Sequence, residues 1–181
     1  MGADAGSKKI KTEIDMIANP MGLIQQISNA NQSSKMSKKV ESGSLAVPIV
    51  IVPSAISSLL TLYNVKEFLE NEKFIPSIEL KEKGATKEFT ATINRSRNRA
   101  TAVPYQIVDN IQRLKVEDWK RVVAVFVQGN TWQFKGWKWT NPIEIFSHVK
   151  GFYLKFDDTP LDESIKNWNV EILTVNFHKL T

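Results

Sequence analysis

The residues best suited to recognition chemistry lie within residues 129–142, where aromatic side chains are interleaved with polar and basic ones. In chain order they are Trp132, Gln133, Phe134, Lys135, Trp137 and Trp139. Rings supply contact area at a low entropic cost and lysine supplies positive charge, so this mixture is typical of a binding surface on a rigid scaffold. We expect at least two of these rings to pack in the core or form a lid, and Trp132, just after Gly129 and Asn130, to be the most exposed.

Basic residues form a second candidate surface. Arg95, Arg97 and Arg99 alternate, so in an extended segment their side chains would point to the same side. One interpretation is a solvated charged loop. The other is an acceptor for phosphate or acidic tails, because the guanidinium fork matches phosphate geometry. Arg121, near the aromatic residues in sequence, is a further candidate.

Catalytic and metal-binding chemistry has little basis in this sequence. The absence of cysteine excludes thiolate zinc sites and cysteine nucleophiles. His148 and His178 are far apart, and neither has metal-ligand spacing around it. An acidic group near residue 160 is more typical of a solvated loop before a helix than of a cation site; its members are Asp157, Asp158, Asp162 and Glu163. We predict a protein that is not an enzyme and has no catalytic, metal or cofactor-binding residues.

A nucleotide-binding α/β protein would carry its phosphate loop directly after the strand expected at residues 46–52. The sequence there is PSAISSLLTL, without glycine or lysine. A phosphate loop needs glycines for close backbone approach and a lysine for the phosphates. Ser54, Ser57 and Ser58 are better explained as helix-capping residues than as anion ligands. A working GTPase is therefore not expected, and the Asn-Lys-x-Asp guanine motif is also missing.

Composition favours one globular domain with a tail. The chain has 181 residues, 42% of them hydrophobic, a net charge of +5 and a pI near 9.3. The basic balance favours acidic or phosphorylated partners or nucleic acid. No apolar run approaches the roughly 20 residues of a membrane span, and the N-terminus lacks a signal peptide's apolar core, so we expect an intracellular protein.

Residues 1–45 are expected to lie outside the globular domain. MGADAGS is typical of a cloning remnant, and the rest is linker-like, rich in Lys, Ser, Asn and Gln. One short helix is predicted, capped by Asn19 with Pro20 at its first position. Its apolar stripe would be Met21, Leu23, Ile24 and Ile27. Residues 46–181 then form a single binding domain.

Hydrophobic patterns predict the elements that position these residues. Strands are expected at residues 46–52, 89–93, 105–108, 122–127, 152–156 and 170–177. Helical segments are expected at 54–63, 65–69 and 117–120, from Asn141-Pro142 to a stop at Gly151, and within 157–168. Residues 77–87 are expected to be a surface loop. Strands separated by helices argue for a three-layer α/β sandwich with a mostly parallel sheet.

Three segments resemble the C-terminal domain of the parafibromin family, the tumour-suppressor subunit of the RNA polymerase II-associated Paf complex. They are VPIVIVPSAISSLLTLYNVKEFLENEKFIPS, VPYQIVDNIQRLKVEDWKRVVAVFVQGNTWQFKGWKW and IEIFSHVKGFYLK. The similarity spans roughly residues 47–178. The short charged segment between Ser77 and Thr101 is more similar to a fungal version than to an animal one.

The resemblance implies a Ras-like fold without a nucleotide-binding site. It also implies a nuclear, non-enzymatic role in transcription elongation, chromatin association and co-transcriptional histone modification. The implied partners are other Paf complex subunits, chromatin, and the phosphorylated repeats of RNA polymerase II and of an elongation factor, with no small-molecule substrate, cofactor or membrane. The family domain usually continues into a C-terminal helix beyond residues 170–177, so we expect some apolar surface to be exposed here.

Our hypothesis for the partner site combines the rim at Trp132, Gln133, Phe134 and Lys135 with Arg121 or the arginines at 95, 97 and 99. A cation would bind phosphate while an exposed ring packs against Tyr or Pro of a repeat. Two alternatives stay open. One is a general chromatin or nucleic-acid binder with steep salt dependence, and the other is a cryptic GTPase, which micromolar GTP binding would reveal.

Overall fold

The computed structural model describes residues 46–95, 101–139 and 141–176. The strands are β1 (Ile49–Ile51), β2 (Ala91–Arg95), β3 (Val103–Val108), β4 (Val122–Val127), β5 (Lys150–Phe156) and β6 (Val170–Val175). The α-helices are α3 (Val65–Asn71), α4 (Ser77–Glu82), α5 (Pro142–His148) and α6 (Glu163–Lys166). Three 3₁₀ helices complete the fold, η1 (Ile111–Arg113), η2 (Val116–Arg121) and η3 (Thr131–Phe134).

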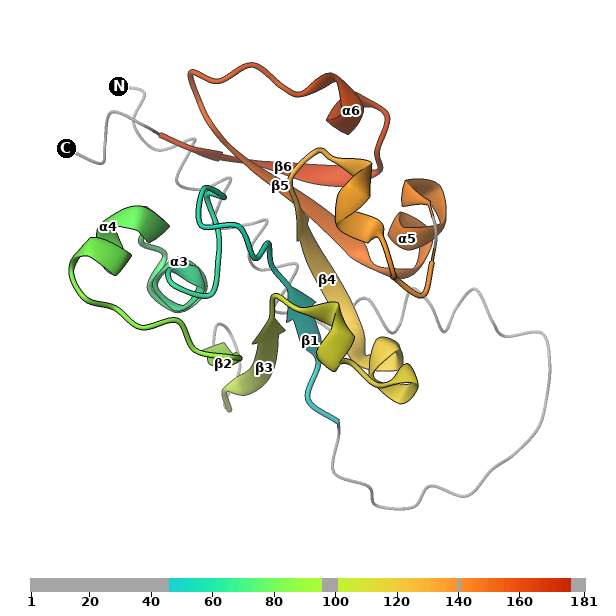
Figure 1. The fold of residues 1–181 in the computed structure, drawn as a ribbon, viewed down its shortest axis with the longest axis horizontal. Coiled ribbons are helices and arrows are strands. Elements are labelled where there is room, and N and C mark those ends of the chain that lie inside the picture. The colour runs from blue at the N-terminus through green and yellow to red at the C-terminus, as the bar shows by residue number, and fades with distance from the viewer. Residues whose placement is uncertain (1–45, 96–100, 140, 177–181) are drawn as a thin grey trace.

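The strands form one six-stranded sheet in the order β2-β3-β1-β4-β5-β6 (Figure 1). All neighbouring pairs are parallel except β2 with β3, which is antiparallel. The mostly parallel α/β prediction is therefore confirmed. The strands β2 and β3 lie on one side of β1 in the sheet, and β4, β5 and β6 lie on the other. The crevice beyond the carboxyl end of β1 is thus a topological switch point, where open α/β sheets commonly bind ligands.

Each face of the sheet is covered by its own apolar cluster, which gives the predicted three layers. One cluster packs α3 against the sheet and includes Phe68, Leu69, Phe126 and Phe152. The opposite cluster packs α5, α6 and the 3₁₀ helices on the sheet. Within it, the buried Trp119 ring lies 5.5 Å from Trp137 and 5.4 Å from Trp139, centroid to centroid. Trp119 thus covers the core beside the central strand β4.

The helix predicted at residues 54–63 is absent, and the first helix after β1 starts only at Val65. The buried side chain of Asn64 explains the irregular path. Its Oδ1 accepts from the backbone N–H of Thr61 at 2.8 Å, and its Nδ2 donates to the carbonyls of Leu59 at 2.7 Å and Ile75 at 2.9 Å. Asparagine side chains compete in this way with the backbone hydrogen bonds of a helix. Here the side-chain bonds of Asn64 form and the helix does not.

Residues 77–87 were predicted to be a loop, but they begin with the helix α4. Pro76 precedes the helix, and Glu79 pairs with Lys83 one turn later, at 2.5 Å between Oε1 and Nζ. Ser77 is anchored inside, with its hydroxyl 2.8 Å from that of Thr61. Most of the segment is exposed, so its surface location is as expected. The pattern was missed because the helix is short and polar on most sides.

Helix α5 starts as predicted but ends earlier. The Asn141 side chain accepts from the backbone N–H of Glu144 at 2.9 Å. The helix stops at His148, and Gly151 lies in β5 rather than ending a helix. A Cβ at Gly151 would come within 2.5 Å of Val170 Cγ1 and 2.8 Å of Phe146 Cδ1. This glycine is therefore needed for close packing.

The remaining strands, the turn at η2 and the short helix α6 lie where the sequence predicted them, with bounds shifted by a few residues. The predicted helix beginning at Pro20 and the residues Arg97, Arg99 and Phe177 lie outside the described residues. Within the described ranges no helix is both long and apolar enough to cross a membrane.

Candidate functional site

A cavity of about 560 Å³ opens at the switch point, beyond the carboxyl ends of β1, β3 and β4. Its lining includes strand ends, two exposed rings, three cations, two acids and several neutral polar side chains. The residues that matter below are Ser54, Lys87, Glu88, Phe89, Asp109, Arg113, Gln128, Trp132, Gln133 and Lys135. Its position is dictated by the topology, because parallel strands deliver their carboxyl ends to one edge of the sheet.

One wall of the cavity is η3, which presents the Trp132 ring with 64% of its surface exposed. The amide of Gln133 fixes this wall to the end of β4. Its Oε1 accepts from Gln128 N–H at 2.9 Å, and its Nε2 donates to the Phe126 carbonyl at 3.0 Å. Phe134 is buried and meets the Trp137 ring edge-on at 5.1 Å. With Phe134 inside, Trp132 faces outward.

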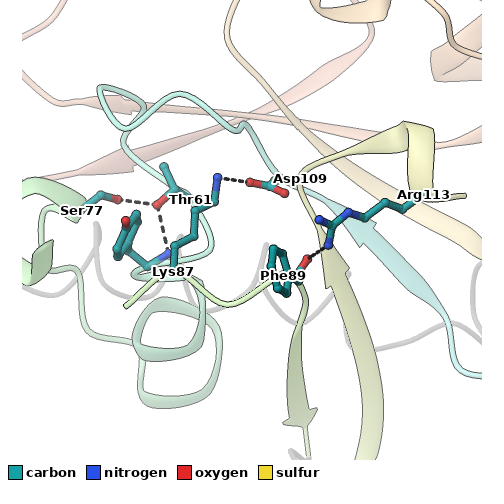
Figure 2. Close-up of polar contacts among 7 residues, drawn as sticks. Thr61, Ser77, Lys87, Phe89, Asp109 and Arg113 are labelled. Carbon is teal, nitrogen blue, oxygen red and sulfur yellow. Dashed lines mark hydrogen bonds and ion pairs between the residues drawn. The ribbon is translucent and has the colours of Figure 1, made fainter. Parts of the chain in front are cut away.

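A second part of the lining comes from the segment between α4 and β2. Phe89 is 76% exposed, and the guanidinium of Arg113 lies 4.5 Å from the centre of its ring. Arg113 Nη1 also donates to the Phe89 carbonyl at 3.4 Å, as Figure 2 shows. A guanidinium over a ring is a favourable cation–π geometry that fixes the plane of the cation. The two walls therefore each present one exposed ring beside a cation.

The charges lining the cavity leave an excess of one positive charge. Lys87, Arg113 and Lys135 are opposed by Glu88 and Asp109. Lys87 Nζ lies 2.5 Å from Asp109 Oδ2, so that pair is internally neutral (Figure 2). Such a site can hold an anionic group at the cations while a ring or proline packs on Trp132 or Phe89.

The structure brings together only part of the sequence-predicted site. Trp132 and Lys135 line the cavity and are exposed, and Trp132 is the most exposed of the predicted rings, as expected. Phe134, Trp137 and Trp139 are buried, which confirms that at least two rings belong to the core. Gln133 lines the cavity, but its amide is engaged with the backbone. Phe134 therefore supports the wall from inside and offers no surface to a partner.

The predicted arginines lie elsewhere. Arg121 directly precedes β4, at the amino ends of the central strands and away from the cavity. There it donates to the Val47 carbonyl at 2.6 Å and to Asp118 Oδ1 at 2.7 Å. That hydrogen bond from Arg121 is the main reason why the pKa of Asp118 is lowered. Arg95 is only 6% exposed and pairs with Val103 at the start of β3, also away from the cavity. Burial makes Arg95 unsuitable as a phosphate acceptor.

Sequence reasoning missed Phe89, Arg113, Lys87 and Asp109. Asp109 and Arg113 follow the predicted strand that ends at Val108, so the rule that ligands bind beyond strand carboxyl ends could have found them. Phe89 and Lys87 carry no such signal, because their position depends on the antiparallel pairing of β2 with β3. Across the parts of the chain that the structure describes, no cluster of three or more His, Cys, Asp or Glu could hold a metal ion.

Fold and site together define a class: a Ras-like α/β domain with an aromatic and basic cavity where a nucleotide-binding relative would carry its phosphate loop. Ser54 lies in that cavity, but no glycine or lysine accompanies it between Pro53 and Leu62. The family model described as RNA pol II accessory factor, Cdc73 family, C-terminal, matches residues 44–180. The chain belongs to this family, and the resemblance seen in the sequence is confirmed.

Individual relatives support the assignment. The chain is 41% identical over 157 residues to an Arabidopsis thaliana protein named Protein CDC73 homolog, covering 83% of this chain and 38% of the relative. It is 35% identical over 134 residues to Cell division control protein 73 of Saccharomyces cerevisiae, covering 73% and 33%. A solved structure titled "The conserved domain of yeast Cdc73" matches with a TM-score of 0.66 and 34% identity, covering 74% of this chain and 84% of that one.

The chain spans about a third of the length of the curated relatives it matches. The family description names an accessory factor of RNA polymerase II rather than an enzyme class. The fungal character predicted from the segment before Thr101 stays a prediction.

Proposed function

We propose that this domain is a non-enzymatic binding module of a nuclear Paf complex subunit. In this proposal it binds the phosphorylated repeats of RNA polymerase II and of an elongation factor. It thereby promotes association with elongating polymerase and chromatin and supports co-transcriptional histone modification. Membership of a family of polymerase accessory factors supports the setting. The cavity chemistry supports the ligand class.

The single observation that carries the proposal is the pairing of exposed rings with cations in one cavity at the switch point. Arg113 uses one guanidinium N–H for the Phe89 carbonyl, which leaves further N–H groups for a phosphate. Lys135, exposed on the other wall, adds a second cation. Trp132 and Phe89 offer rings on which a tyrosine or proline of a repeat can pack.

A general chromatin or nucleic-acid binder is the second candidate. It is favoured by the net charge of +5 and by the exposed ring of Trp132 near Lys135, because unpaired bases stack on such rings. This second hypothesis predicts a binding affinity that does not depend on the phosphorylation state of a peptide and that falls steeply as the salt concentration rises. The first candidate is favoured because these rings and cations line one cavity, which fits a short peptide segment that carries a phosphate.

Fluorescence anisotropy tests the proposal. Phosphorylated and unphosphorylated repeat peptides are titrated at two salt concentrations with the wild type, Trp132→Ala and Arg113→Ala. Ile143→Ala is the matched control, because Ile143 is 84% exposed but lies outside this cavity. We expect phosphate-dependent binding that either cavity variant weakens by about 5- to 30-fold, since anchor residues contribute roughly 1–2 kcal/mol.

The control should bind like the wild type. Binding that Ile143→Ala weakens as much as Trp132→Ala would place the site elsewhere. Binding that does not depend on phosphate and disappears at the higher salt concentration would favour the nucleic-acid candidate.

A further inference from the structure

The pair formed by Lys87 and Asp109 sits inside the proposed binding cavity. Asp109 is the first residue after β3, so its carboxylate lies at the carboxyl edge of the sheet, with a side chain only 9% exposed. Lys87 reaches it from the segment between α4 and β2 and keeps 36% of its side chain exposed (Figure 2). Both residues line the cavity that also contains Arg113 and Lys135.

Among the described residues, Lys87 is the cation that pairs with Asp109, whose side chain is mostly buried. A poorly solvated carboxylate resists losing such a partner, because an unpaired charge there is costly. The ammonium group of Lys87 is therefore held by Asp109 and is not readily available to a ligand. Among the described residues, neither Arg113 nor Lys135 forms an ion pair with a carboxylate. Of the three cations that line the cavity, Lys87 is the one whose charge is already neutralised.

We propose that Asp109 is a built-in competitor for the anionic group of the ligand. By neutralising Lys87 and placing a negative charge beside the cavity, it sets the affinity of the site for phosphate. An incoming phosphate meets the attraction of Arg113 and Lys135, the repulsion of Glu88 and, from the Lys87–Asp109 pair, little net charge. The pair thereby lowers the affinity of the cavity for an anionic group. This inference rests on the function proposed above.

Three proteins test it: the wild type, Asp109→Asn, and the double variant Lys87→Met/Asp109→Asn. Asp109→Asn is nearly isosteric, removes the competing charge and releases Lys87 to face an anion. The double variant has the same net cavity charge as the wild type. Inorganic phosphate is the first probe, titrated at low ionic strength and followed through the NMR signal of the Trp132 indole N–H. The phosphorylated repeat peptide is the second.

We expect Asp109→Asn to bind inorganic phosphate about 5-fold or more tightly than the wild type. The double variant should return to within about 2-fold of the wild type. The phosphorylated peptide should follow the same order, while the unphosphorylated peptide does not change. Thermal melting checks that all three proteins are folded.

Two results would overturn the inference. One is an Asp109→Asn protein that binds phosphate no more tightly than the wild type, including no detectable binding by either. The other is a double variant that keeps the whole gain, because the cause would then be loosening of the wall rather than charge. If phosphate binding follows the expected order and the repeat peptide still does not bind, the tail-reading function fails while the role of Asp109 stands.

Discussion

At the scale of single residues, burial decides which side chains can act. Trp132 and Phe134 are two positions apart in the same 3₁₀ helix, yet one is 64% exposed and the other is packed among rings. Arg113 and Arg121 differ in location. The guanidinium of Arg113 lies over the Phe89 ring at the cavity, whereas Arg121 bonds the Val47 carbonyl at the other end of the central strands. Residue type indicated a binding surface, but the environment selected its members.

Gly151 gives a prediction at this scale. Gly151→Ala is expected to lower the free energy of unfolding by roughly 1–3 kcal/mol, because its Cβ would clash with Val170 and Phe146 in a packed core. Denaturant unfolding measures the change. Gly84→Ala is the comparison: its Cβ meets nothing within 4 Å, but its φ of +88° is unfavourable for alanine and should cost about 1 kcal/mol. A smaller loss at Gly151 than at Gly84 would contradict the packing argument.

At the scale of elements, the segment between β1 and α3 shows how a side chain can replace regular structure. The apolar spacing of residues 54–63 resembles a helix, but these residues follow an irregular path that Asn64 holds through three backbone contacts. Pro53 and Ser54, at the start of this segment, line the cavity.

Asn64→Ala is therefore expected to be among the costly polar substitutions. It would leave one N–H and two carbonyls without these partners, and the expected loss is about 2–4 kcal/mol of unfolding free energy. Asn71→Ala is the matched control, since Asn71 is exposed and, among the described residues, its side chain bonds Glu67 of its own helix. This variant should change stability by less than about 0.5 kcal/mol. Equal effects in thermal or denaturant unfolding would mean that Asn64 does not organise the segment.

At the scale of the whole molecule, the sheet order determines where a ligand can bind. Because β1 lies between the parallel strands β3 and β4, the carboxyl ends of these three strands lie side by side. Residues near positions 54, 88, 110 and 133 therefore meet in one cavity. The fold is Ras-like, but at this edge it presents rings and cations in place of a phosphate loop. The same architecture that serves nucleotide binding elsewhere is here free to serve another ligand.

The whole domain should therefore not bind GTP. A fluorescent GTP analogue, with an authentic Ras-like GTPase as positive control, should give no saturable signal at micromolar concentration. The reason is chemical: without glycines the backbone cannot approach the phosphates, and a lysine is missing from the loop. Saturable micromolar binding would restore the GTPase alternative.

Local sequence patterns were enough to predict the class of fold, the strand at β4, the start of α5 and the exposure of Trp132. Each of these depends on local pattern: apolar runs, a capping residue followed by proline, and a ring placed after Gly129 and Asn130. The family was also identified from the sequence, because three long segments resemble its C-terminal domain.

The set of residues that share the cavity could not be predicted in this way, because it depends on how the whole sheet packs. Phe89 and Lys87 lie just before β2, so their place at the cavity depends on the antiparallel pairing of β2 with β3. Arg95, at the far end of β2, is buried. The physical reason is that a site beyond strand ends is assembled from contacts distant in sequence. Local propensity can place a strand, but only the packing of the whole sheet places its ends beside one another.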